Sequence, residues 1–278
     1  MLALSRRTAL AAGALLLPSR ALGQAAPWRK LRDLEGSSGT RIGLAAIDTG
    51  SGNAIFYREA ELFLMCSTCK LLVVAAVLSR IGRGQESATR LVRYGKADMM
   101  DYSAVTRENI AQGMTVGALC KAAIQNSDNI AGALLMRDLG GPAAVTRYVR
   151  SLGDMRTRLD RTEPMLNEPD GNLDTTAPSA MLADMKTLLL ENALAPVARQ
   201  QLMEWLKAGI TGVTRLRAGL PPSWTIGDKT GSGGGGAVND IAIAIPPGRA
   251  AILIAAYTNH GSDAVLAEIG RILAGEFA

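Results

Sequence analysis

The order of hydrophobic and polar positions divides the chain into two kinds of segment. Toward both ends, short apolar runs are interrupted by glycine, asparagine and proline, which is typical of strands joined by tight turns. Between them lie longer stretches in which apolar residues recur every three or four positions, and this spacing predicts helices. The predicted strands are 41–49, 54–58, 224–230, 239–245 and 251–258, and the predicted helices are 70–81, 116–126, 129–139, 142–152, 178–191, 196–207 and 263–277.

Neither group of strands is large enough to bury a hydrophobic face by itself. One antiparallel five-stranded sheet, built from both chain ends and covered by helices from both ends, solves this problem. The central helices then form an inserted all-helical lobe. We therefore predict an α+β fold in which residues 26–62 and 208–278 form a discontinuous α/β lobe, residues 63–207 form the helical lobe, and a cleft lies between the two.

The first 25 residues have a composition of their own. They contain Arg6, Arg7 and Arg20 but no acid, then the apolar stretch 9–17, then small residues. This is the composition of an export signal, and the paired arginines resemble a twin-arginine leader. The apolar stretch is too short to span a bilayer. We expect a periplasmic monomer with no membrane anchor once residues 1–25 are removed.

Composition excludes several classes of protein. The 278 residues include one histidine, His260, which cannot supply a zinc site that needs two or three imidazoles, and a serine–histidine–aspartate triad is also not expected. Aromatic residues make up 4% of the chain and the formal net charge is +5, so a nucleic-acid binder would lack both stacking surface and charge. We expect no metal, no cofactor and no nucleic-acid partner.

The three cysteines permit one alternative function. Cys66 and Cys69 form a C-x-x-C, and Cys120 is left over. A thiol-disulfide protein places this motif in a strand–helix–strand unit, whereas here a loop precedes the motif and an apolar helix follows it. Redox chemistry is therefore the less favoured interpretation.

Ser67 and Lys70 form the sole S-x-x-K of the chain, at the start of an apolar helix. A spacing of three on a helix places the hydroxyl and the amine on one face. A desolvated lysine beside the positive helix end could act as a base toward the serine. A capping serine next to an unrelated surface lysine fits the same spacing, so this motif decides nothing alone.

Three further motifs are equally ambiguous when they are taken singly. The S-D-N at 127–129 has the composition of a helix cap, and the K-T-G at 229–231 fits the edge of a strand. Glu163 and Asn167 belong to a long stretch without helical or strand periodicity, which in a compact domain is usually functional or disordered. A carboxylate beside a carboxamide can orient and deprotonate a water.

Together, S-x-x-K, S-D-N, E-x-x-L-N and K-T-G occur in the order that makes the chain similar to class A serine β-lactamases. The resemblance extends from the first predicted hairpin through WTIGDKTGSG and NDIAIAIP to the last helix. It implies that small-molecule β-lactams, penicillins and cephalosporins, are hydrolysed through a serine acyl-enzyme, which confers antibiotic resistance. The alternative is a penicillin-binding D,D-peptidase or sensor domain that acylates without turnover, and Glu163 with Asn167 favours the hydrolase.

The resemblance also implies a catalytic role for each motif residue. Ser67 is the expected nucleophile, and Lys70 is expected to accept its proton, either directly or through a water activated by Glu163. Ser127 is expected to relay a proton to the lactam nitrogen. Glu163 and Asn167 are expected to hold the water that hydrolyses the acyl-enzyme, whereas the S-D-N aspartate is expected to point inward.

Further residues are expected to bind the substrate. The implied set is Lys229, Thr230 and Arg215 for the substrate carboxylate, Asn129 for its acylamide side chain, Tyr102 for a wall of the cleft, and Ser232, whose backbone N–H joins that of Ser67 in an oxyanion hole.

The cysteines depart from the family pattern. In members that hydrolyse carbapenems, the cysteine before the nucleophile is often bridged to one after the K-T-G, but Cys66 has Gly233 at that place. Cys120 matches half of another family bridge, and Val74 occupies the other half. We therefore expect free thiols and do not expect efficient carbapenem hydrolysis.

The loop from 167 to 174 looks shorter than in familiar relatives, with Arg161 and Asp174 placed to close its neck as an ion pair. Combined with the glycines at 233–236, the shorter loop predicts a roomier pocket for bulky cephalosporin side chains.

Overall fold

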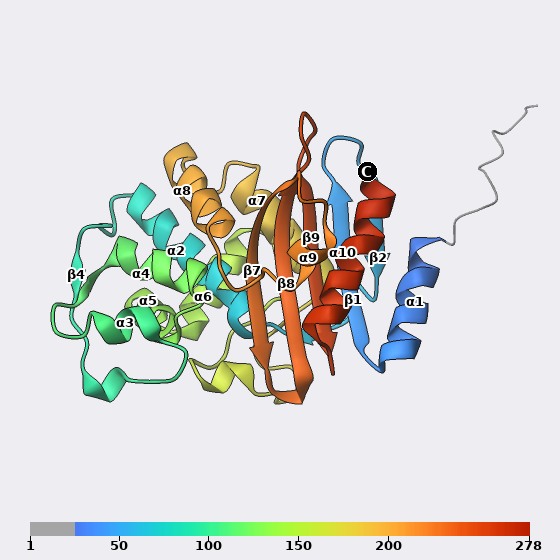
Figure 1. Ribbon diagram of the computed structural model, residues 1–278. Helices are drawn as coiled ribbons and strands as arrows, with labels where there is room; N and C mark the ends of the chain where they lie inside the picture. The colour runs from blue at the N-terminus through green and yellow to red at the C-terminus, as the bar shows by residue number, and fades with distance from the viewer. Residues whose placement is uncertain (1–25) are drawn as a thin grey trace, which may run out of the picture.

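The computed structural model describes residues 26–278. A five-stranded antiparallel sheet in the order β2-β1-β9-β8-β7 forms one lobe, and helices form most of the other (Figure 1). Strand β1 pairs with β9, so the two ends of the chain share one sheet, and the predicted α+β class is confirmed. The strands of this sheet are β1 (Arg41–Asp48), β2 (Ala54–Tyr57), β7 (Thr225–Gly233), β8 (Ala237–Ile245) and β9 (Ile252–Asn259).

Eight helices of at least ten residues account for most of the remaining described chain, and short elements connect them. The longer helices are α1 (Pro27–Ser38), α2 (Lys70–Gly82), α4 (Val116–Gln125), α5 (Asn129–Leu139), α6 (Pro142–Ser151), α7 (Pro178–Leu189), α8 (Pro196–Lys207) and α10 (Asp263–Phe277). The short elements are α3 (Ala104–Glu108), α9 (Leu216–Gly219), the 3-10 turns Cys66–Cys69, Lys96–Asp98, Met165–Asn167 and Gly234–Gly236, and two ribbons that pair β3 (Phe63–Leu64) with β6 (Thr175–Thr176) and β4 (Leu91–Val92) with β5 (Met114–Thr115). The predicted helices are present, whereas α1 escapes a pattern-based assignment because Leu31 is its one buried residue.

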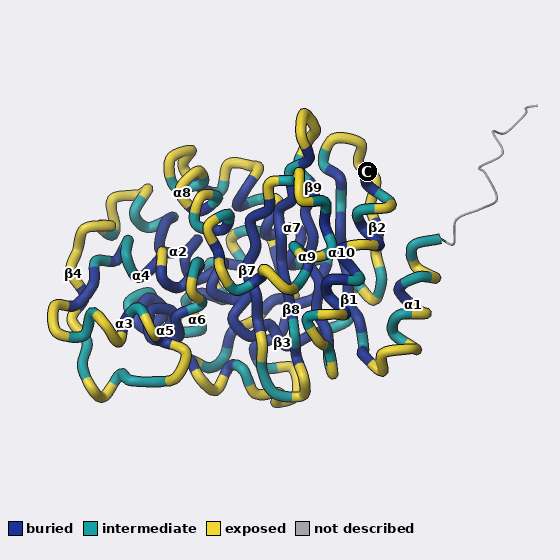
Figure 2. The backbone as a smooth tube through the Cα atoms, in the orientation of Figure 1, coloured by how far each residue is buried: buried dark blue, intermediate teal, exposed yellow. Residues whose placement is uncertain are grey.

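The sheet is buried on both faces. On β9, Leu253, Ala255 and Tyr257 belong to the core shared with the helical lobe, while the alternate residues Ile254 and Ala256 belong to the core beneath α1 and α10. This division follows from the strand period of two. Figure 2 shows the result as buried backbone through the middle of the sheet.

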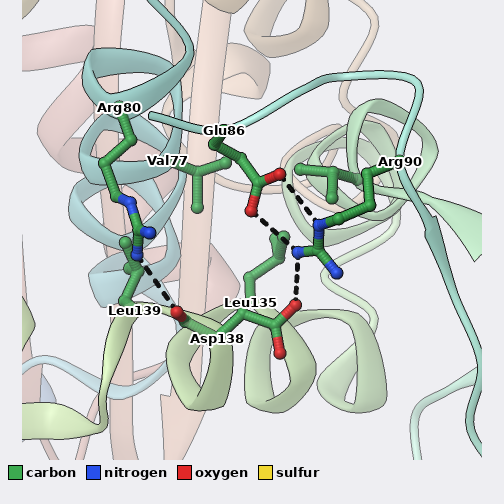
Figure 3. A pocket seen from close by; sticks show the side chains of 8 residues that line it. Val77, Arg80, Glu86, Arg90, Leu135, Asp138 and Leu139 are labelled. Atoms are coloured by element: carbon green, nitrogen blue, oxygen red, sulfur yellow. Dashed lines mark hydrogen bonds and ion pairs between the residues drawn. The ribbon is translucent and has the colours of Figure 1, made fainter. Parts of the chain in front are cut away.

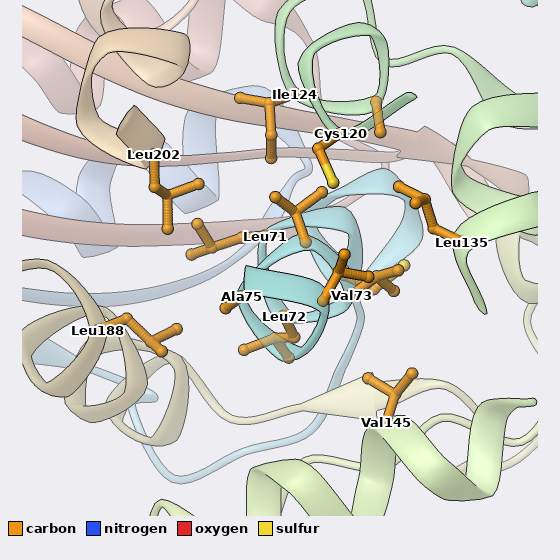
Figure 4. Packing of buried hydrophobic residues seen from close by; sticks show 14 of the residues in the cluster. Leu71, Leu72, Val73, Ala75, Cys120, Ile124, Leu135, Val145, Leu188 and Leu202 are labelled. Carbon is orange, nitrogen blue, oxygen red and sulfur yellow. The ribbon is translucent and has the colours of Figure 1, made fainter. Parts of the chain in front are cut away.

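Helix α2 is the centre of the helical lobe. Every residue from Lys70 to Leu78 is buried, and a helix that is apolar on all sides must be enclosed. Figure 4 shows residues of α4, α5, α6, α7 and α8 around it, among them Ile124, Leu135 and Val145. The S-x-x-K motif is therefore attached to the most enclosed helix of the lobe.

Strand β7 is longer than the predicted strand 224–230. It continues to Gly233 and places Ser232 opposite Val238 of β8. A Cβ on Gly231 would lie 2.7 Å from the carbonyl oxygen of Met65, and one on Gly233 would overlap the carbonyl oxygen of Asn167. These glycines therefore extend the strand because only a backbone without side chains can pass this close to its neighbours.

Two expectations about the chain's organisation stay predictions. These are the lobe boundaries at 26–62, 63–207 and 208–278, and the export signal at 1–25, which lies outside the described residues. In the described part of the chain, no helix has the length and apolar character needed to cross a membrane.

Helices α9 and α10 meet at a glycine, and this contact gives a stability prediction. A Cβ on Gly219 would overlap the carbonyl oxygen of Ala267, whereas one on Gly36 in α1 would meet nothing within 4 Å. Gly219→Ala should lower the free energy of unfolding by about 1–3 kcal/mol through overpacking. Gly36→Ala should raise it by up to about 1 kcal/mol, because alanine favours helix. Urea denaturation followed by circular dichroism checks both, and equal effects would contradict the packing argument.

Candidate active site

Ser67 and Lys70 are in direct contact. Ser67 lies in the 3-10 turn that leads into α2, and Lys70 is the first residue of that helix. The Lys70 Nζ donates a hydrogen bond of 2.8 Å to the Ser67 Oγ. The lysine is 1% exposed and the serine 9%, so the spacing of three produces a buried hydroxyl–amine pair and not a surface lysine.

The Lys70 amine is also surrounded by oxygen atoms from two other segments, the S-D-N and the loop that carries Glu163. It donates to the Asn129 Oδ1 at 2.6 Å and to the Ser127 carbonyl at 3.0 Å, and it lies 2.8 Å from the Glu163 Oε1. The side chains of Lys70 and Glu163 are both 1% exposed. Because an unpaired buried charge is very costly, this contact stabilises both residues in the interior.

A glycine on the neighbouring helix makes room for the lysine. Gly132 of α5 faces the Lys70 side chain, and a Cβ there would lie 2.7 Å from the Lys70 Cε. Sequence reasoning did not identify this residue, although its spacing of three from Asn129 places both on one helix face.

The S-D-N segment connects α4 to α5, and its three residues divide into one structural anchor and two that face Lys70. Asp128 is 1% exposed and points inward as expected: its carboxylate accepts hydrogen bonds from the Ala131 N–H at 3.0 Å, which caps α5, and from the Thr106 hydroxyl at 2.8 Å. This anchor leaves Ser127 and Asn129 turned toward Lys70. Ser127 has a φ of +55°, a conformation that serine seldom adopts.

Strand β7 contributes a second buried lysine. The Lys229 Nζ donates to the Ser127 Oγ at 2.9 Å and to the Thr230 carbonyl at 2.8 Å. Burial, together with the positive charge of Lys70, lowers the pKa of Lys229 to about 7. Two lysine side chains therefore contact Ser127, and the lowered pKa of Lys229 leaves that lysine only partly protonated near neutral pH.

Two more residues surround the outer part of β7. The Thr230 Oγ1 donates to the Thr211 Oγ1 at 2.6 Å. Arg215 donates to the Ser232 Oγ at 2.7 Å and forms an ion pair with Asp263 at 2.9 Å. Thr211 belongs to no motif in the sequence, and nothing in its spacing identifies it.

The loop that carries Glu163 and Asn167 is closed as expected. Arg161 and Asp174 form an ion pair of 2.6 Å at its neck. The Asn167 Nδ2 donates to the Glu163 Oε2 at 2.5 Å, while the Asn167 Oδ1 is buried without a partner among the described residues. The loop therefore presents a carboxylate and a free amide oxygen side by side.

These segments meet in a cleft of about 910 Å³. Lys70, Lys229 and Glu163 lie beneath its surface, and Tyr102, which is 87% exposed, stands at its rim. The lining residues are Ser67, Met99, Met100, Asp101, Tyr102, Asn126, Ser127, Asn129, Pro164, Asn167, Glu168, Thr211, Arg215, Thr230 and the run from Gly231 to Gly234. The structure thus brings all eleven predicted site residues to one place, either lining this cleft or directly under it.

The cysteines are unsuited to thiol chemistry. Cys66, Cys69 and Cys120 are free and buried. Burial raises the pKa of the Cys66 and Cys120 thiols to about 12, and that of Cys69 above its usual range. The reactive species would be the thiolate, so all three side chains are inert packing groups at neutral pH. No group of metal-ligating side chains gathers within residues 26–278.

A second hollow in the helical lobe is filled by its own charges. Figure 3 shows Arg90 between Glu86 and Asp138, with ion pairs of 2.7 and 2.6 Å. Hydrogen bonding to Arg90 lowers the pKa of Glu86 to about 2. With a volume of about 10 Å³, the hollow has space for little more than a water molecule.

Known proteins resemble this chain in sequence and in structure. Residues 26–277 match the family described as the Beta-lactamase enzyme family. The β-lactamase AST-1 of Nocardia asteroides is 44% identical over 88% of this chain and 81% of its own length, and the β-lactamase OXY-1 of Klebsiella oxytoca is 43% identical over 96% and 97%. A solved structure of an ancestral (GNCA) class A β-lactamase superposes with a TM-score of 0.89 at 52% identity, covering 91% of this chain and all of that one. The chain belongs to the class A β-lactamase family.

Proposed function

We propose that this protein opens the β-lactam ring of penicillins and cephalosporins through an acyl-enzyme on Ser67 and then hydrolyses that intermediate, which confers resistance. One observation carries the proposal: the Lys70 amine lies 2.8 Å from both the Ser67 hydroxyl and the Glu163 carboxylate. Such an arrangement joins a nucleophile to a base and to the carboxylate required for the second step.

In the first step, the Ser67 Oγ attacks the lactam carbonyl carbon and loses its proton. Either Lys70 has first given a proton to the Glu163 carboxylate 2.8 Å away and then accepts the serine proton as a neutral amine, or the serine proton passes through a water to Glu163. The backbone N–H groups of Ser67 and Ser232 hold the oxygen that becomes negative. Strand β7 is an edge of the sheet, and Ser232 lines the cleft beside Ser67, which supports this assignment.

Cleavage of the ring requires a proton on the lactam nitrogen. Ser127 relays it: the hydroxyl gives its proton to the nitrogen and takes up in its place the proton that left Ser67. This hydroxyl lies at the cleft surface and accepts a hydrogen bond of 2.9 Å from Lys229. A protonated lysine behind a hydroxyl makes that hydroxyl a better proton donor. The Ser127 carbonyl accepts a second hydrogen bond, from Lys70, so both the backbone and the side chain of Ser127 are held by a lysine.

Different residues of the cleft bind different parts of the substrate. Lys229, Thr230 and Arg215 bind the substrate carboxylate, and Asn129 binds the acylamide group. Tyr102 at the rim forms a wall against the bound drug. Arginine and lysine are the groups that recognise a carboxylate best.

In the second step, Glu163 and Asn167 hold the water that attacks the acyl-enzyme. Within residues 26–278 the Asn167 Oδ1 is a buried acceptor without a protein partner, and the adjacent Glu163 carboxylate can take a proton from a water bound there. This pair is what separates a hydrolase from a penicillin-binding peptidase.

The preference among β-lactams is a finer part of the proposal. The Asn167 carbonyl lies where a Cβ on Gly233 would be. The loop therefore packs against this glycine and fills part of the pocket space that a missing side chain would otherwise leave open. Preference for bulky cephalosporins, and weak activity on carbapenems, remain predictions. Export to the periplasm by the twin-arginine route, the absence of a membrane anchor and a monomeric state likewise belong to the proposal.

Turnover of nitrocefin tests the function directly. The mature protein should hydrolyse many equivalents, while Ser67→Ala should hydrolyse none above background, because the nucleophile is gone. The protein with both Cys66 and Cys69 changed to alanine should retain turnover. A colour change that stops after one equivalent would identify a penicillin-binding protein, and loss of activity only in the cysteine variant would support the redox alternative.

Removing Glu163 should separate the two steps. Glu163→Ala should accumulate a covalent adduct of the mass of the intact penicillin, because the acyl-enzyme forms but its hydrolysis lacks a base. Intact-protein mass spectrometry detects this adduct. Asp170→Ala, which removes an exposed acid of the same loop, should show turnover and no adduct. Full turnover by Glu163→Ala would exclude this residue from the mechanism.

Lys70→Ala tests the first step. Acylation should slow by about a hundred- to ten-thousandfold, as is typical for the loss of a general base. Stopped-flow absorbance under single-turnover conditions measures the rate. An acylation rate within a few-fold of the wild type would assign the base to Glu163 and its water alone.

The pKa of Lys229 gives a pH dependence. A lysine whose pKa is lowered to about 7 loses its positive charge above that pH, so binding of the substrate carboxylate should weaken. We expect kcat/KM, which reports the free enzyme, to fall above pH 7, while kcat falls only at higher pH because a bound carboxylate restores the proton. In Lys229→Arg this alkaline fall should disappear, since arginine stays charged. If the pH profile of kcat/KM in Lys229→Arg matched that of the wild type, another group would be the cause of the alkaline fall.

A further inference from the structure

Asn239 is a buried polar residue outside the four motifs. It belongs to β8, which lies between β7 and β9 in the sheet (Figure 1). The residue is 0% exposed and does not line the cleft. A carboxamide that is buried needs partners for its two N–H groups and its oxygen, so its contacts show what the side chain holds in place.

The carboxamide of Asn239 connects the sheet to the segment that leads to the nucleophile. Its Nδ2 donates to the Leu64 carbonyl at 2.8 Å and to the Met65 carbonyl at 3.3 Å. Its Oδ1 accepts a hydrogen bond of 3.0 Å from the Thr258 N–H of β9. One side chain therefore joins the end of β9 to two successive carbonyls that come just before Ser67 in the chain.

The turn between Met65 and Ser67 has an unusual backbone. Cys66 has a φ of +48°, which is uncommon for a residue with a Cβ. The Met65 carbonyl also accepts a hydrogen bond of 2.8 Å from the Thr68 hydroxyl, so the chain folds back on itself here. Backbone of this kind persists only where its surroundings hold it, and Asn239 supplies such support from the sheet.

The same turn packs against β7. A Cβ on Gly231 would lie 2.7 Å from the Met65 carbonyl oxygen, and Gly231 is the partner of Asn239 in the pairing of β7 with β8. The Arg215 guanidinium donates to the Gly231 carbonyl at 2.9 Å and to the Asn239 carbonyl at 2.8 Å. Asn239 is therefore held to the strand that carries Ser232 by its backbone and to the nucleophile turn by its side chain.

We propose that Asn239 is a positioning residue for the oxyanion hole. The backbone N–H of Ser67 follows the turn that Asn239 holds, and the backbone N–H of Ser232 belongs to the strand that packs against this turn. Asn239 thereby sets the separation of the two N–H groups without touching the substrate. This inference rests on the proposed function, because the oxyanion hole is assigned there.

The oxyanion hole serves both chemical steps. The lactam carbonyl oxygen becomes negative when Ser67 attacks, and the ester carbonyl oxygen becomes negative when water attacks the acyl-enzyme, so both transition states need the same two donors. Displacement of one donor should therefore slow acylation and deacylation together. Binding of the intact substrate should change little, because other residues bind its carboxylate and acylamide groups.

Asn239→Asp changes only the donor end of the side chain. The variant keeps an oxygen for the Thr258 N–H but turns a second oxygen toward the Leu64 and Met65 carbonyls. The rate constants of acylation and deacylation should each fall by about ten- to a hundredfold, since complete loss of an oxyanion donor costs about a hundred- to a thousandfold. The dissociation constant of the noncovalent complex should stay within about twofold of the wild type. Stopped-flow absorbance with nitrocefin measures all three quantities.

Ile254→Val is the control for loss of stability. It deletes one buried methyl group on the other face of β9, in the core beneath α1 and α10. Its Tm should fall by about 2–4 °C while the three kinetic quantities stay unchanged. If Asn239→Asp does not fold, the same rate constants are measured in Asn239→Ala, where a water can take the place of the amide.

Unchanged rate constants for both steps in a folded Asn239 variant would overturn the inference. A fall confined to one step would do the same, because the oxyanion hole is used in both, and so would an equal fall in Ile254→Val. If the wild type stops after one equivalent of nitrocefin, the proposed function fails instead.

Discussion

The buried ammonium group of Lys70 is the constraint on which the site depends. A lysine that is 1% exposed is tolerated only when its charge and its three N–H groups have partners. Here they come from the Ser67 hydroxyl, the S-D-N segment and the Glu163 carboxylate. Each partner belongs to a different part of the helical lobe. Satisfying one amine therefore fixes the relative positions of the nucleophile, the proton relay and the loop carboxylate, and removing one partner of such a pair typically costs about 3–5 kcal/mol.

Ser127 joins the two lobes through the same electrostatics. Its carbonyl accepts a hydrogen bond from Lys70 in the helical lobe, and its hydroxyl accepts one from Lys229 on β7. The two lysines repel each other, which is part of the reason why the pKa of Lys229 is lowered. The left-handed φ of Ser127 is unfavourable for a residue with a Cβ, and the two contacts hold it there. The serine is therefore oriented before a substrate arrives.

Much of this arrangement could be predicted from the sequence, but not its close approaches. The strand and helix periods are local, so the sheet and the long helices were accessible, and the order of four motifs identified the family. The residues that make contact possible carry little local signal. Gly132 gives room to the Lys70 chain, and Gly231 and Gly233 let β7 approach Met65 and the loop, yet each resembles an ordinary glycine until its neighbours are known. Thr211 was missed for the same reason: its partner Thr230 is distant in the sequence.

The parts of the cleft differ in how firmly they are held, and this difference bears on how activity and specificity can change. Ser67 and Lys70 begin a helix enclosed by the main hydrophobic core, so changing their positions would require repacking that core. The loop from Arg161 to Asp174 is held together by its own polar contacts, an ion pair at its neck and the hydrogen bonds of Asn167 to Glu163 and Pro164. It is anchored to the helical lobe by the contact of Glu163 with Lys70 and by the buried side chain of Leu166. Substitutions there, at positions other than Glu163 and Asn167, can alter the shape and charge of the cleft wall while the nucleophile and its amine stay in place. Specificity is therefore free to vary at the remaining loop positions, because the nucleophile and its amine are anchored in the helix.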